Sequence, residues 1–261
     1  RYSSLPRSRR NPDCSGIMVE RPRGILIMTD ESPRYALYFA PDPASPLWRF
    51  GSSVIGYDAA SGELVEPLLQ PDTMLSRSWS DLTEEPRRYG FHATLKAPFR
   101  LAQGTDEAKL IAAMHRFATD AHSVPIAGLS ATAIGPFIAL TPMGDETALN
   151  ALASRIVKEF DIFRAPLSDA DIARRLKSPL TQRQHEYLMQ FGYPHVHEEF
   201  RFHMTLTGPL HEDDREVALA HLKAAFAREV PEPVTTIDRI CLFRQAHAAD
   251  KFKRVDCAPL R

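Results

Sequence analysis

Two eight-residue segments of this chain repeat one pattern of residues that can do acid–base chemistry. FHATLKAP spans residues 91–98 and FHMTLTGP spans residues 202–209, and both fit Phe-His-x-Thr-Leu-x-(Ala/Gly)-Pro. Each segment places a histidine two positions before a threonine. Since the unperturbed pKa of histidine is about 6.5, two imidazoles can serve as base and acid near neutral pH. The repetition therefore predicts one site that uses both segments.

Both segments are predicted to be strands, which fixes the direction of these side chains. Each ends at a proline and alternates apolar with polar positions. Side chains alternate between the two faces of a strand, so His92 and Thr94 share a face of the first strand. His203 and Thr205 likewise share a face of the second. Packing explains the apolar residues on the opposite faces, but it gives no reason for histidine and threonine in both copies.

The same alternation brings Lys96 and Arg201 to the polar faces as candidate substrate-binding cations. Arg244 could reach the site or cover a sheet edge, and Tyr193 could stack on a base or pack a turn. Imidazoles, hydroxyls and cations suit cleavage of a phosphodiester, in which a base deprotonates the nucleophile and an acid protonates the leaving oxygen. Hydroxyls and a cation would stabilise charge on the non-bridging oxygens. This chemistry requires no metal or other cofactor.

A second histidine pair is a weaker candidate. PHVHEEF places His195 and His197 two residues apart, as some metal sites require, but no third ligand is evident. We interpret this segment as a solvated edge of the cleft, with metal binding as the alternative. HEYLM, residues 185–189, begins like a zinc-protease helix but has Met189 where the second histidine is needed. The sequence holds no G-x-x-x-x-G-K string, so it gives no support for ATP use.

Strands and helices are predicted to alternate along the chain. The expected strands are 34–41, 87–99, two short strands around Gly135 within 124–143, 199–210, 234–245 and 252–260. The expected helices are 46–56, 71–84, 106–121, 146–163, one that begins after Ser168, and 213–229. Each motif strand is thus followed by an amphipathic helix and further strands, which indicates an internal duplication. The predicted fold class is α+β, with two lobes that each hold an antiparallel sheet with helices on one face.

The composition restricts the possible partners. The 261 residues include 32 basic and 33 acidic side chains, and this net charge of −1 disfavours long nucleic acid. No apolar run has the length of a membrane span, and the basic N-terminus lacks the apolar core of a secretory signal. Cys14, Cys241 and Cys257 form an odd, sparse set, which argues against a disulfide framework. We expect a cytoplasmic protein without a membrane partner; its oligomeric state stays open.

The chain divides into an extension and one predicted domain. Residues 1–33 are rich in Arg, Pro and Ser with little apolar periodicity, which is typical of a disordered arm. Residues 34–261 are predicted to form a single bilobal domain. Its first motif-bearing half is about 34–143 and its second about 144–261.

The strings HATL and HMTL resemble the defining feature of the 2H phosphoesterase superfamily, two H-x-(T/S)-h motifs in which h is hydrophobic. RYGFHATLKAPF, GYPHVHEEFRFHMTLTGPL and ICLFRQ resemble one branch more closely. That branch is a family of uncharacterised proteins encoded with carbon–phosphorus lyase genes for phosphonate degradation. The resemblance covers roughly residues 34–261 and leaves the N-terminal arm outside.

The resemblance implies a bilobal fold with pseudo-twofold symmetry and a water-filled cleft between the lobes. It implies His92 and His203 as the acid–base pair, with Thr94 and Thr205 as phosphate holders, and both motifs are intact. It also implies a small substrate of the nucleotide or ribose phosphate type, from phosphonate breakdown. We therefore predict a metal-independent phosphoesterase that hydrolyses a small cyclic phosphate or phosphodiester. The alternative is a non-catalytic module that binds nucleotides or RNA ends in the same cleft.

Overall fold

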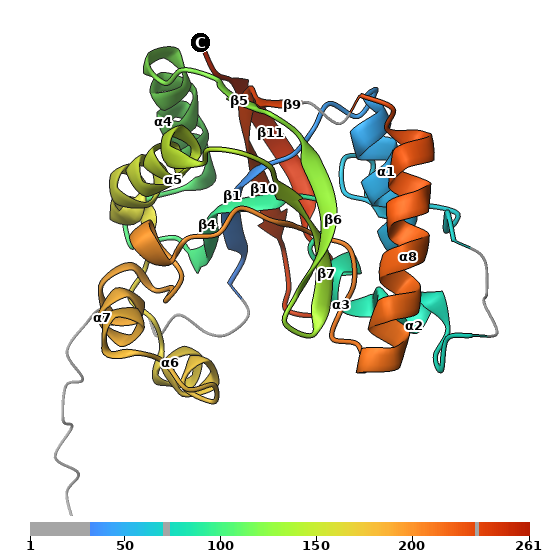
Figure 1. Ribbon diagram of the computed structural model, residues 1–261. Coiled ribbons are helices and arrows are strands. Elements are labelled where there is room, and N and C mark those ends of the chain that lie inside the picture. The colour runs from blue at the N-terminus through green and yellow to red at the C-terminus, as the bar shows by residue number, and fades with distance from the viewer. Residues whose placement is uncertain (1–31, 70–73, 233–234) are drawn as a thin grey trace, which may run out of the picture.

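The structure is a computed structural model that describes residues 32–69, 74–232 and 235–261. Within these residues, seven strands form one antiparallel sheet in the order β11-β10-β1-β4-β8-β7-β6 (Figure 1). Its strands are β1 (Arg34–Phe39), β4 (Ala93–Arg100), β6 (Leu129–Ile134), β7 (Phe137–Pro142), β8 (Met204–Thr205), β10 (Arg239–Gln245) and β11 (Lys253–Pro259). Two small pairs are β2 (Tyr57–Asp58) with β3 (Glu63–Leu64), and β5 (Val124–Ile126) with β9 (Thr235–Ile237). The predicted arm 1–33 lies outside the described residues apart from its last two positions.

Helices pack on both sides of the sheet. The α-helices are α1 (Pro46–Ile55), α2 (Trp79–Leu82), α3 (Glu84–Arg87), α4 (Glu107–Asp120), α5 (Thr147–Glu159), α6 (Asp169–Arg175), α7 (Gln182–Phe191) and α8 (Glu212–Glu229), and two 3₁₀ turns are η1 (Asp161–Phe163) and η2 (His197–Glu199). Helix α4 contacts β10 and β11, and α5 contacts β4, whereas α8 contacts β6, β7 and α1. Figure 1 shows α4 and α5 on one side of the strands and α1 and α8 on the other. The buried apolar residues form one cluster that runs from Tyr35 to Ala258.

The centre of the sheet is the junction between the two motif strands. Strands β4 and β8 meet through one residue pair, Ala93 with Met204, whereas β1 and β10 pair along most of their length. The prediction of an α+β fold built from antiparallel strands is confirmed. The two expected sheets, however, are joined here into one. A two-residue strand can supply few ladder bonds, so this junction is the narrowest connection in the sheet.

The predicted division of the sequence near residue 143 does not coincide with a division of the sheet. Strands β10 and β11 come from the C-terminal half of the chain, yet they lie beside β1 and β4. Strands β6 and β7 come from the N-terminal half, yet they lie beside β8. Each side of the β4–β8 junction therefore contains strands from both halves. Local sequence patterns identify strands but do not specify their long-range partners, which is why the exchange was not predicted.

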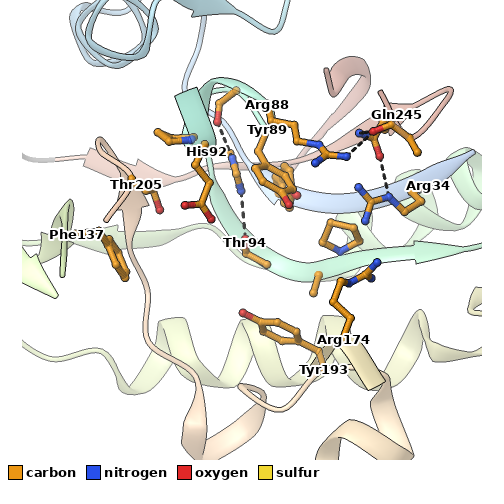
Figure 2. A pocket seen from close by; sticks show the side chains of 18 of the residues that line it. Arg34, Arg88, Tyr89, His92, Thr94, Phe137, Arg174, Tyr193, Thr205 and Gln245 are labelled. Carbon is orange, nitrogen blue, oxygen red and sulfur yellow. Dashed lines mark hydrogen bonds between the residues drawn. The ribbon is translucent and has the colours of Figure 1, made fainter. Parts of the chain in front are cut away.

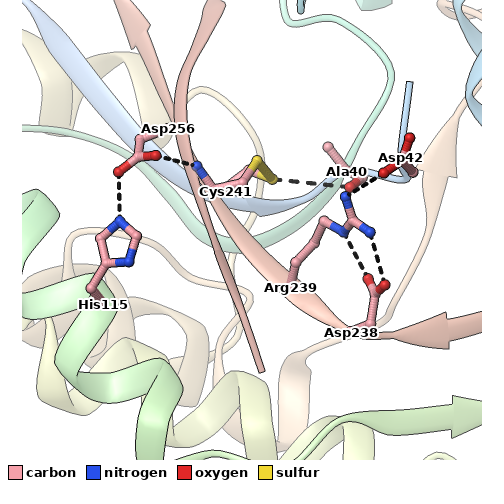
Figure 3. The surroundings of a disulfide bond; sticks show 8 residues. Ala40, Asp42, His115, Asp238, Arg239, Cys241 and Asp256 are labelled. Atoms are coloured by element: carbon pink, nitrogen blue, oxygen red, sulfur yellow. Dashed lines mark hydrogen bonds and ion pairs between the residues drawn. A yellow bond between two sulfur atoms is a disulfide. The ribbon is translucent and has the colours of Figure 1, made fainter. Parts of the chain in front are cut away.

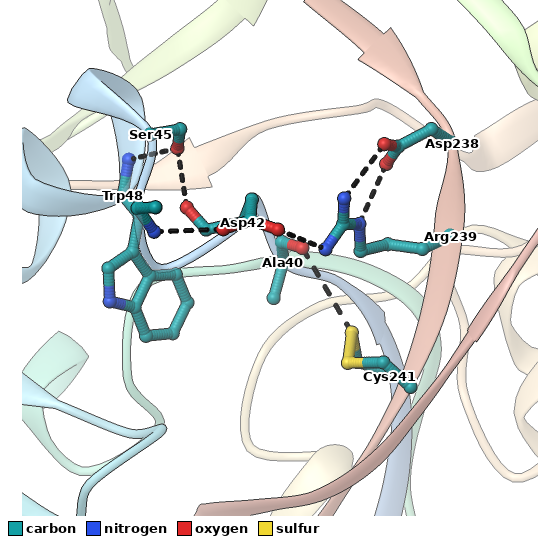
Figure 4. A network of polar contacts seen from close by, with 9 residues as sticks. Ala40, Asp42, Ser45, Trp48, Asp238, Arg239 and Cys241 are labelled. Atoms are coloured by element: carbon teal, nitrogen blue, oxygen red, sulfur yellow. Dashed lines mark hydrogen bonds and ion pairs between the residues drawn. A yellow bond between two sulfur atoms is a disulfide. The ribbon is translucent and has the colours of Figure 1, made fainter.

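The connection from β1 to α1 is fixed by polar contacts. Ser45 caps α1 by accepting a hydrogen bond of 3.1 Å from the backbone N–H of Trp48. Asp42, just before this cap, accepts a hydrogen bond of 3.1 Å from Arg239, which also binds Asp238 at 2.9 Å (Figure 4). Because Arg239 begins β10, this network ties the entry of α1 to the start of a neighbouring strand.

A disulfide between Cys241 and Cys257 corrects the expectation drawn from the cysteine count. The two cysteines are 16 residues apart and lie directly opposite each other in the β10–β11 ladder. Next to Cys257, the carboxylate of Asp256 lies 2.7 Å from Nε2 of His115, which connects β11 to α4 (Figure 3). Counting cysteines gave no hint of the bridge because only the strand register brings these two positions together.

The predicted secondary structure differs most from the observed one around the second motif. Residues 199–210 were expected to form one strand, but only Met204–Thr205 is paired as a strand, and η2 stands just before the motif. Helix α7, with a capping box formed by Thr181 and Gln184, was not predicted. In contrast, α4, α8 and the Ser168 cap of α6 agree with the sequence to within a residue or two.

None of the helices in the described parts of the chain combines the length and the apolar character that a bilayer crossing requires.

Candidate active site

The two motif strands have the alternating faces that the sequence predicts. Their apolar positions are almost completely buried: Phe91, Ala93, Leu95, Phe202, Met204 and Leu206. The histidines and threonines between them are partly exposed: His92, Thr94, His203 and Thr205. Each segment therefore anchors itself in the core through one face and offers imidazole and hydroxyl groups on the other.

His92 is held from three directions. Its Nδ1 lies 2.8 Å from the carbonyl oxygen of Gly90, and its Nε2 lies 3.2 Å from the hydroxyl of Thr94. The ring stacks on Tyr38, with ring centres 3.6 Å apart and planes 18° apart. Since a carbonyl oxygen can only accept, Nδ1 carries the proton of the neutral ring, and Nε2 presents its lone pair.

The pKa of His92 also favours the neutral ring. The pKa of His92 is lowered to about 4, chiefly by burial and also by the charge of His203, against an opposing effect of the hydrogen bond to Gly90. Burial disfavours the charged imidazolium because it removes hydration from the ring. His92 is therefore neutral at physiological pH, with Nε2 ready to accept a proton.

His203 repeats the backbone contact of His92. Its Nδ1 lies 2.8 Å from the carbonyl oxygen of Arg201, again two residues earlier in the chain. Its ring lies 5.8 Å from that of Phe137, measured between ring centres. In both motifs the same local contact thus orients the ring and directs Nε2 away from its own backbone.

The strand register relates the two motifs. Ala93 pairs with Met204, the residues between histidine and threonine in each motif. Continued by one residue on either side, the antiparallel register sets His92 opposite Thr205 and Thr94 opposite His203. Directly opposite residues on one face of a sheet have Cβ atoms about 5 Å apart. The effect of His203 on the pKa of His92 agrees with this proximity.

A cavity of about 510 Å³ opens on this polar face. His92, Thr94 and Thr205 line it, together with Tyr38 and Phe137 (Figure 2). His203 is not among the described residues that line the cavity. Phe137, whose ring lies next to that of His203, does line it. The volume is within the range of pockets that hold small ligands.

Lys96 does not reach the cavity. Leu37 of β1 pairs with Lys96, whereas the next residue, Tyr38, pairs with Thr94, so β4 has one extra residue at position 95. Because Leu37 and Tyr38 face opposite sides of β1, their partners do too, and this bulge turns Lys96 away from Thr94. The side chain is only 3% exposed. It binds Asp161 at 3.1 Å and the carbonyl of Val157 at 3.2 Å.

Of the other predicted binding residues, one lines the cavity and two lie outside it. Tyr193 lines the cavity. Arg201 is exposed outside it and donates to the carbonyl oxygens of Glu198 and Phe200. Arg244 is also exposed outside it, in an ion pair of 3.1 Å with Glu107. Of these three, the structure brings only Tyr193 to the motif residues.

The cations that line the cavity were missed by the sequence analysis. They are Arg34, Arg88, Arg100, Arg174 and Arg175. The strand period could have identified Arg34. It is four residues from Tyr38 in β1, so the two side chains share a face of that strand. The arginines of α6 gave no such signal, because only the packing of that helix brings them here.

The structure gives the histidine pair His195 and His197 no further metal ligands among the described residues. Within the described parts of the chain, no group of three or more His, Cys, Asp or Glu side chains could hold a metal ion. His195 is exposed, while Nδ1 of His197 lies 2.5 Å from the hydroxyl of Ser154. Neither histidine lines the cavity.

Residues 94–253 match the model of one family, described as "Protein of unknown function (DUF1045)". Two curated relatives carry the name ribose 1,5-bisphosphate phosphokinase PhnN. The protein of Janthinobacterium sp. (strain Marseille) is 36% identical over 231 residues, which is 87% of this chain and 51% of that protein. The protein of Laribacter hongkongensis (strain HLHK9) is 34% identical over 220 residues, 84% of this chain and 50% of that protein. The chain thus spans about half the length of these relatives.

Two solved structures of Kluyveromyces marxianus Usb1 are similar at low levels. One gives a TM-score of 0.33 at 12% identity, and the other, with uridine monophosphate, a TM-score of 0.31 at 11% identity. Each alignment covers 88% of this chain and 99% of the other. Scores this low carry no inference about a site or a reaction.

Proposed function

This chain belongs to the DUF1045 family of proteins of unknown function, and we propose that it is a metal-independent phosphoesterase that hydrolyses a small cyclic phosphate or phosphodiester. The observation that carries the proposal is the register of the two motifs. In this register each histidine is opposite the other motif's threonine, and His92, Thr94 and Thr205 line one cavity. A phosphate placed there would meet groups from both strands.

In the proposed reaction, Nε2 of neutral His92 removes a proton from a water molecule. The water oxygen forms a bond to phosphorus, and the bond from phosphorus to the leaving ester oxygen breaks. Protonated His203 gives its proton to that oxygen, so a diester yields a phosphate monoester and an alcohol, and a cyclic phosphate opens to one monoester that carries the freed hydroxyl. The lowered pKa of His92 supports its assignment as the base rather than the acid.

Charge that develops on the phosphate is stabilised by neighbouring donors. The hydroxyls of Thr94 and Thr205 line the cavity and can donate to the two non-bridging oxygens. Tyr38, whose pKa is raised well above its usual value by burial, stays a neutral phenol and supports the His92 ring. The pseudo-twofold arrangement of the lobes around this cleft, the phosphoesterase class and the origin of the substrate in phosphonate breakdown are parts of the same proposal.

A kinase is the competing candidate, because the curated relatives are named for one. The chain spans about half of those proteins and contains no G-x-x-x-x-G-K loop, which favours the hydrolase for this half. The other alternative is a binding module that uses the same residues without turnover.

The test is a screen of the purified protein against 2′,3′-cyclic nucleotides and ribose cyclic phosphates, followed by phosphorus NMR with EDTA present. We expect a phosphate monoester to appear without metal. Parallel reactions with ATP and ribose phosphates test the kinase. Phosphoryl transfer from ATP, activity that EDTA abolishes, or binding without any turnover would each contradict the proposed function.

A further inference from the structure

The wall of the cavity is strongly basic although the chain as a whole is nearly neutral. Arg34, Arg88, Arg100, Arg174 and Arg175 all line it. Glu85 is the one carboxylate among the described residues of the wall. The net charge of the whole chain is only −1, so this concentration of positive charge is local. A basic concave surface of this kind attracts an anionic ligand.

Two of these arginines share one carboxylate within the protein. Asp171 accepts from Arg100 at 3.0 Å and from Arg174 at 2.6 Å. Asp171 in turn is buried and fixed by Ser168, the N-cap of α6. These contacts position α6 against β4. Arg100 and Arg174 therefore have a structural role, although they also line the cavity.

The other three arginines have no carboxylate partner among the described residues. Arg34 donates from Nε to Gln245 at 2.7 Å, and Arg88 donates to the carbonyl oxygen of Ala248. Arg175 lies over the ring of Tyr193, 5.3 Å from its centre, and its buried Nε has no hydrogen-bond partner. A backbone carbonyl, an amide and an aromatic ring orient these guanidinium groups. None of these groups carries a negative charge that would offset that of the arginines.

Neighbouring arginine charges act on two of these groups, Arg34 and Arg175. Burial lowers the pKa of Arg34, and the charges of Arg88 and Arg174 lower it further, against an opposing effect of Tyr89. Burial also lowers the pKa of Arg175, as do the charges of Arg174 and Arg34, while Tyr193 and Asp171 act in the opposite direction. Like charges held together at a partly buried site raise the free energy of the empty protein. A bound anion would relieve this repulsion.

The basic cluster is set apart from the motif residues. In Figure 2, Arg34, Arg88 and Arg174 lie on one side of the view and His92 and Thr205 on the other, with Tyr89 between them. The ring of Tyr89 is 6.4 Å from that of His92, measured between centres. One cavity therefore offers two polar ends separated by aromatic side chains.

We propose that Arg34, Arg88 and Arg175 form a second anion subsite, which binds a phosphate monoester carried by the substrate. This inference rests on the proposed function and narrows its substrate class to a phosphorylated sugar or nucleotide. Its scissile diester lies at His92, Thr94 and Thr205, and its second phosphate lies at the arginines. Guanidinium groups suit this role because their planar donors match phosphate oxygens in pairs.

The sugar of such a substrate would lie between the two ends. Tyr89 and Tyr193 line the cavity, and their rings and hydroxyls can contact a sugar. The volume of about 510 Å³ suits one sugar with two phosphate groups better than a polymer. The subsite therefore selects for small doubly phosphorylated molecules.

Binding to a catalytically inactive variant tests the subsite directly. The probes are adenosine 2′,3′-cyclic phosphate with and without a 5′-phosphate, titrated calorimetrically into His92→Ala protein. We expect the 5′-phosphate to tighten binding about 10–100-fold, as charge-assisted hydrogen bonds do. Adding Arg34→Gln or Arg175→Gln should remove most of this gain and leave the affinity for the 5′-hydroxyl probe within about twofold. Added salt should reduce the gain, since exposed charges are screened.

Arg244→Gln is the matched control, because Arg244 is an arginine outside the cavity and should keep the full gain. Arg88→Gln provides a variant at an exposed position, where loss of folding is not expected. Equal affinity of His92→Ala protein for both probes would overturn the subsite even if wild type hydrolyses cyclic phosphates. A 5′-phosphate preference that depends on the arginines, without turnover by wild type, would support the subsite and contradict the hydrolase.

Discussion

Ala93 and Met204 pair across the junction of β4 and β8, and this one pair determines how the two motifs face each other. Both side chains are completely buried, so the register is locked by the core rather than by the polar face. A shift of one residue would bury a histidine and expose an apolar side chain. Packing on one side of the sheet thus holds the motif histidines and threonines in position on the other.

Removal of either imidazole should remove a proton-transfer step. We expect His92→Ala and His203→Ala to lower turnover about 10²–10⁴-fold with a much smaller effect on ligand binding. Single-turnover rates and calorimetric affinities measure the two effects separately. His185→Ala, at an exposed position of α7, is the control and should behave as wild type. Unchanged turnover in either motif variant would exclude that histidine from the reaction.

The two threonines should contribute alike, because the register gives them equivalent places. Thr94→Val and Thr205→Val each remove one donor to the developing charge, with an expected loss in kcat of about 10²-fold. Thr119→Val, on the exposed side of α4, provides the control. A loss seen only in KM would assign the hydroxyls to ground-state binding instead.

The pH dependence should reflect the neutral state of His92. Its pKa in the folded protein is lowered to about 4, so the base becomes protonated, and kcat/KM falls, only when the pH drops well below 6.5. A second limb on the basic side should follow loss of the acid's proton, and the two limbs describe the coupled pair. An acidic limb centred at or above about pH 6.5 would contradict His92 as the base.

Replacement of Lys96 should affect stability rather than substrate affinity. Lys96→Met removes the buried contacts to Asp161 and to the carbonyl of Val157. We expect the free energy of unfolding to fall by about 1–3 kcal/mol, the usual effect of unsatisfied buried groups, with KM unchanged. Lys158→Met, at an exposed position of α5, is the matched control. A large change in KM without loss of stability would return Lys96 to the substrate site.

Loss of the disulfide should destabilise the C-terminal strand pair. Cys241→Ala together with Cys257→Ala opens a loop whose ends are 16 residues apart, which corresponds to about 3 kcal/mol of stability. Thermal unfolding of wild type with reductant should shift in the same direction. Reductant should have no effect on the double variant. If wild type unfolds identically with and without reductant, the bridge contributes nothing to stability.

The sequence by itself determined which side of each motif strand carries the histidine and the threonine. The alternation of Phe91 and His92, or of Phe202 and His203, depends on a period of two that is local to the strand. The pairing of the two histidines followed from their repetition. The helices α4 and α8 were also predictable, because their buried residues recur with the helical period, which is local.

Only the tertiary structure decided what surrounds the motifs. The bulge beside Leu95 removed Lys96 from the cavity, and no local pattern marks such a register shift. The Cys241–Cys257 bridge and the arginines of β1 and α6 depend on contacts between distant parts of the chain. Such contacts are set by which surfaces exclude water together, a property of the whole fold rather than of any segment. The sequence therefore predicted the shared polar face of the motif histidines and threonines, and long-range packing decided which cations lie around them.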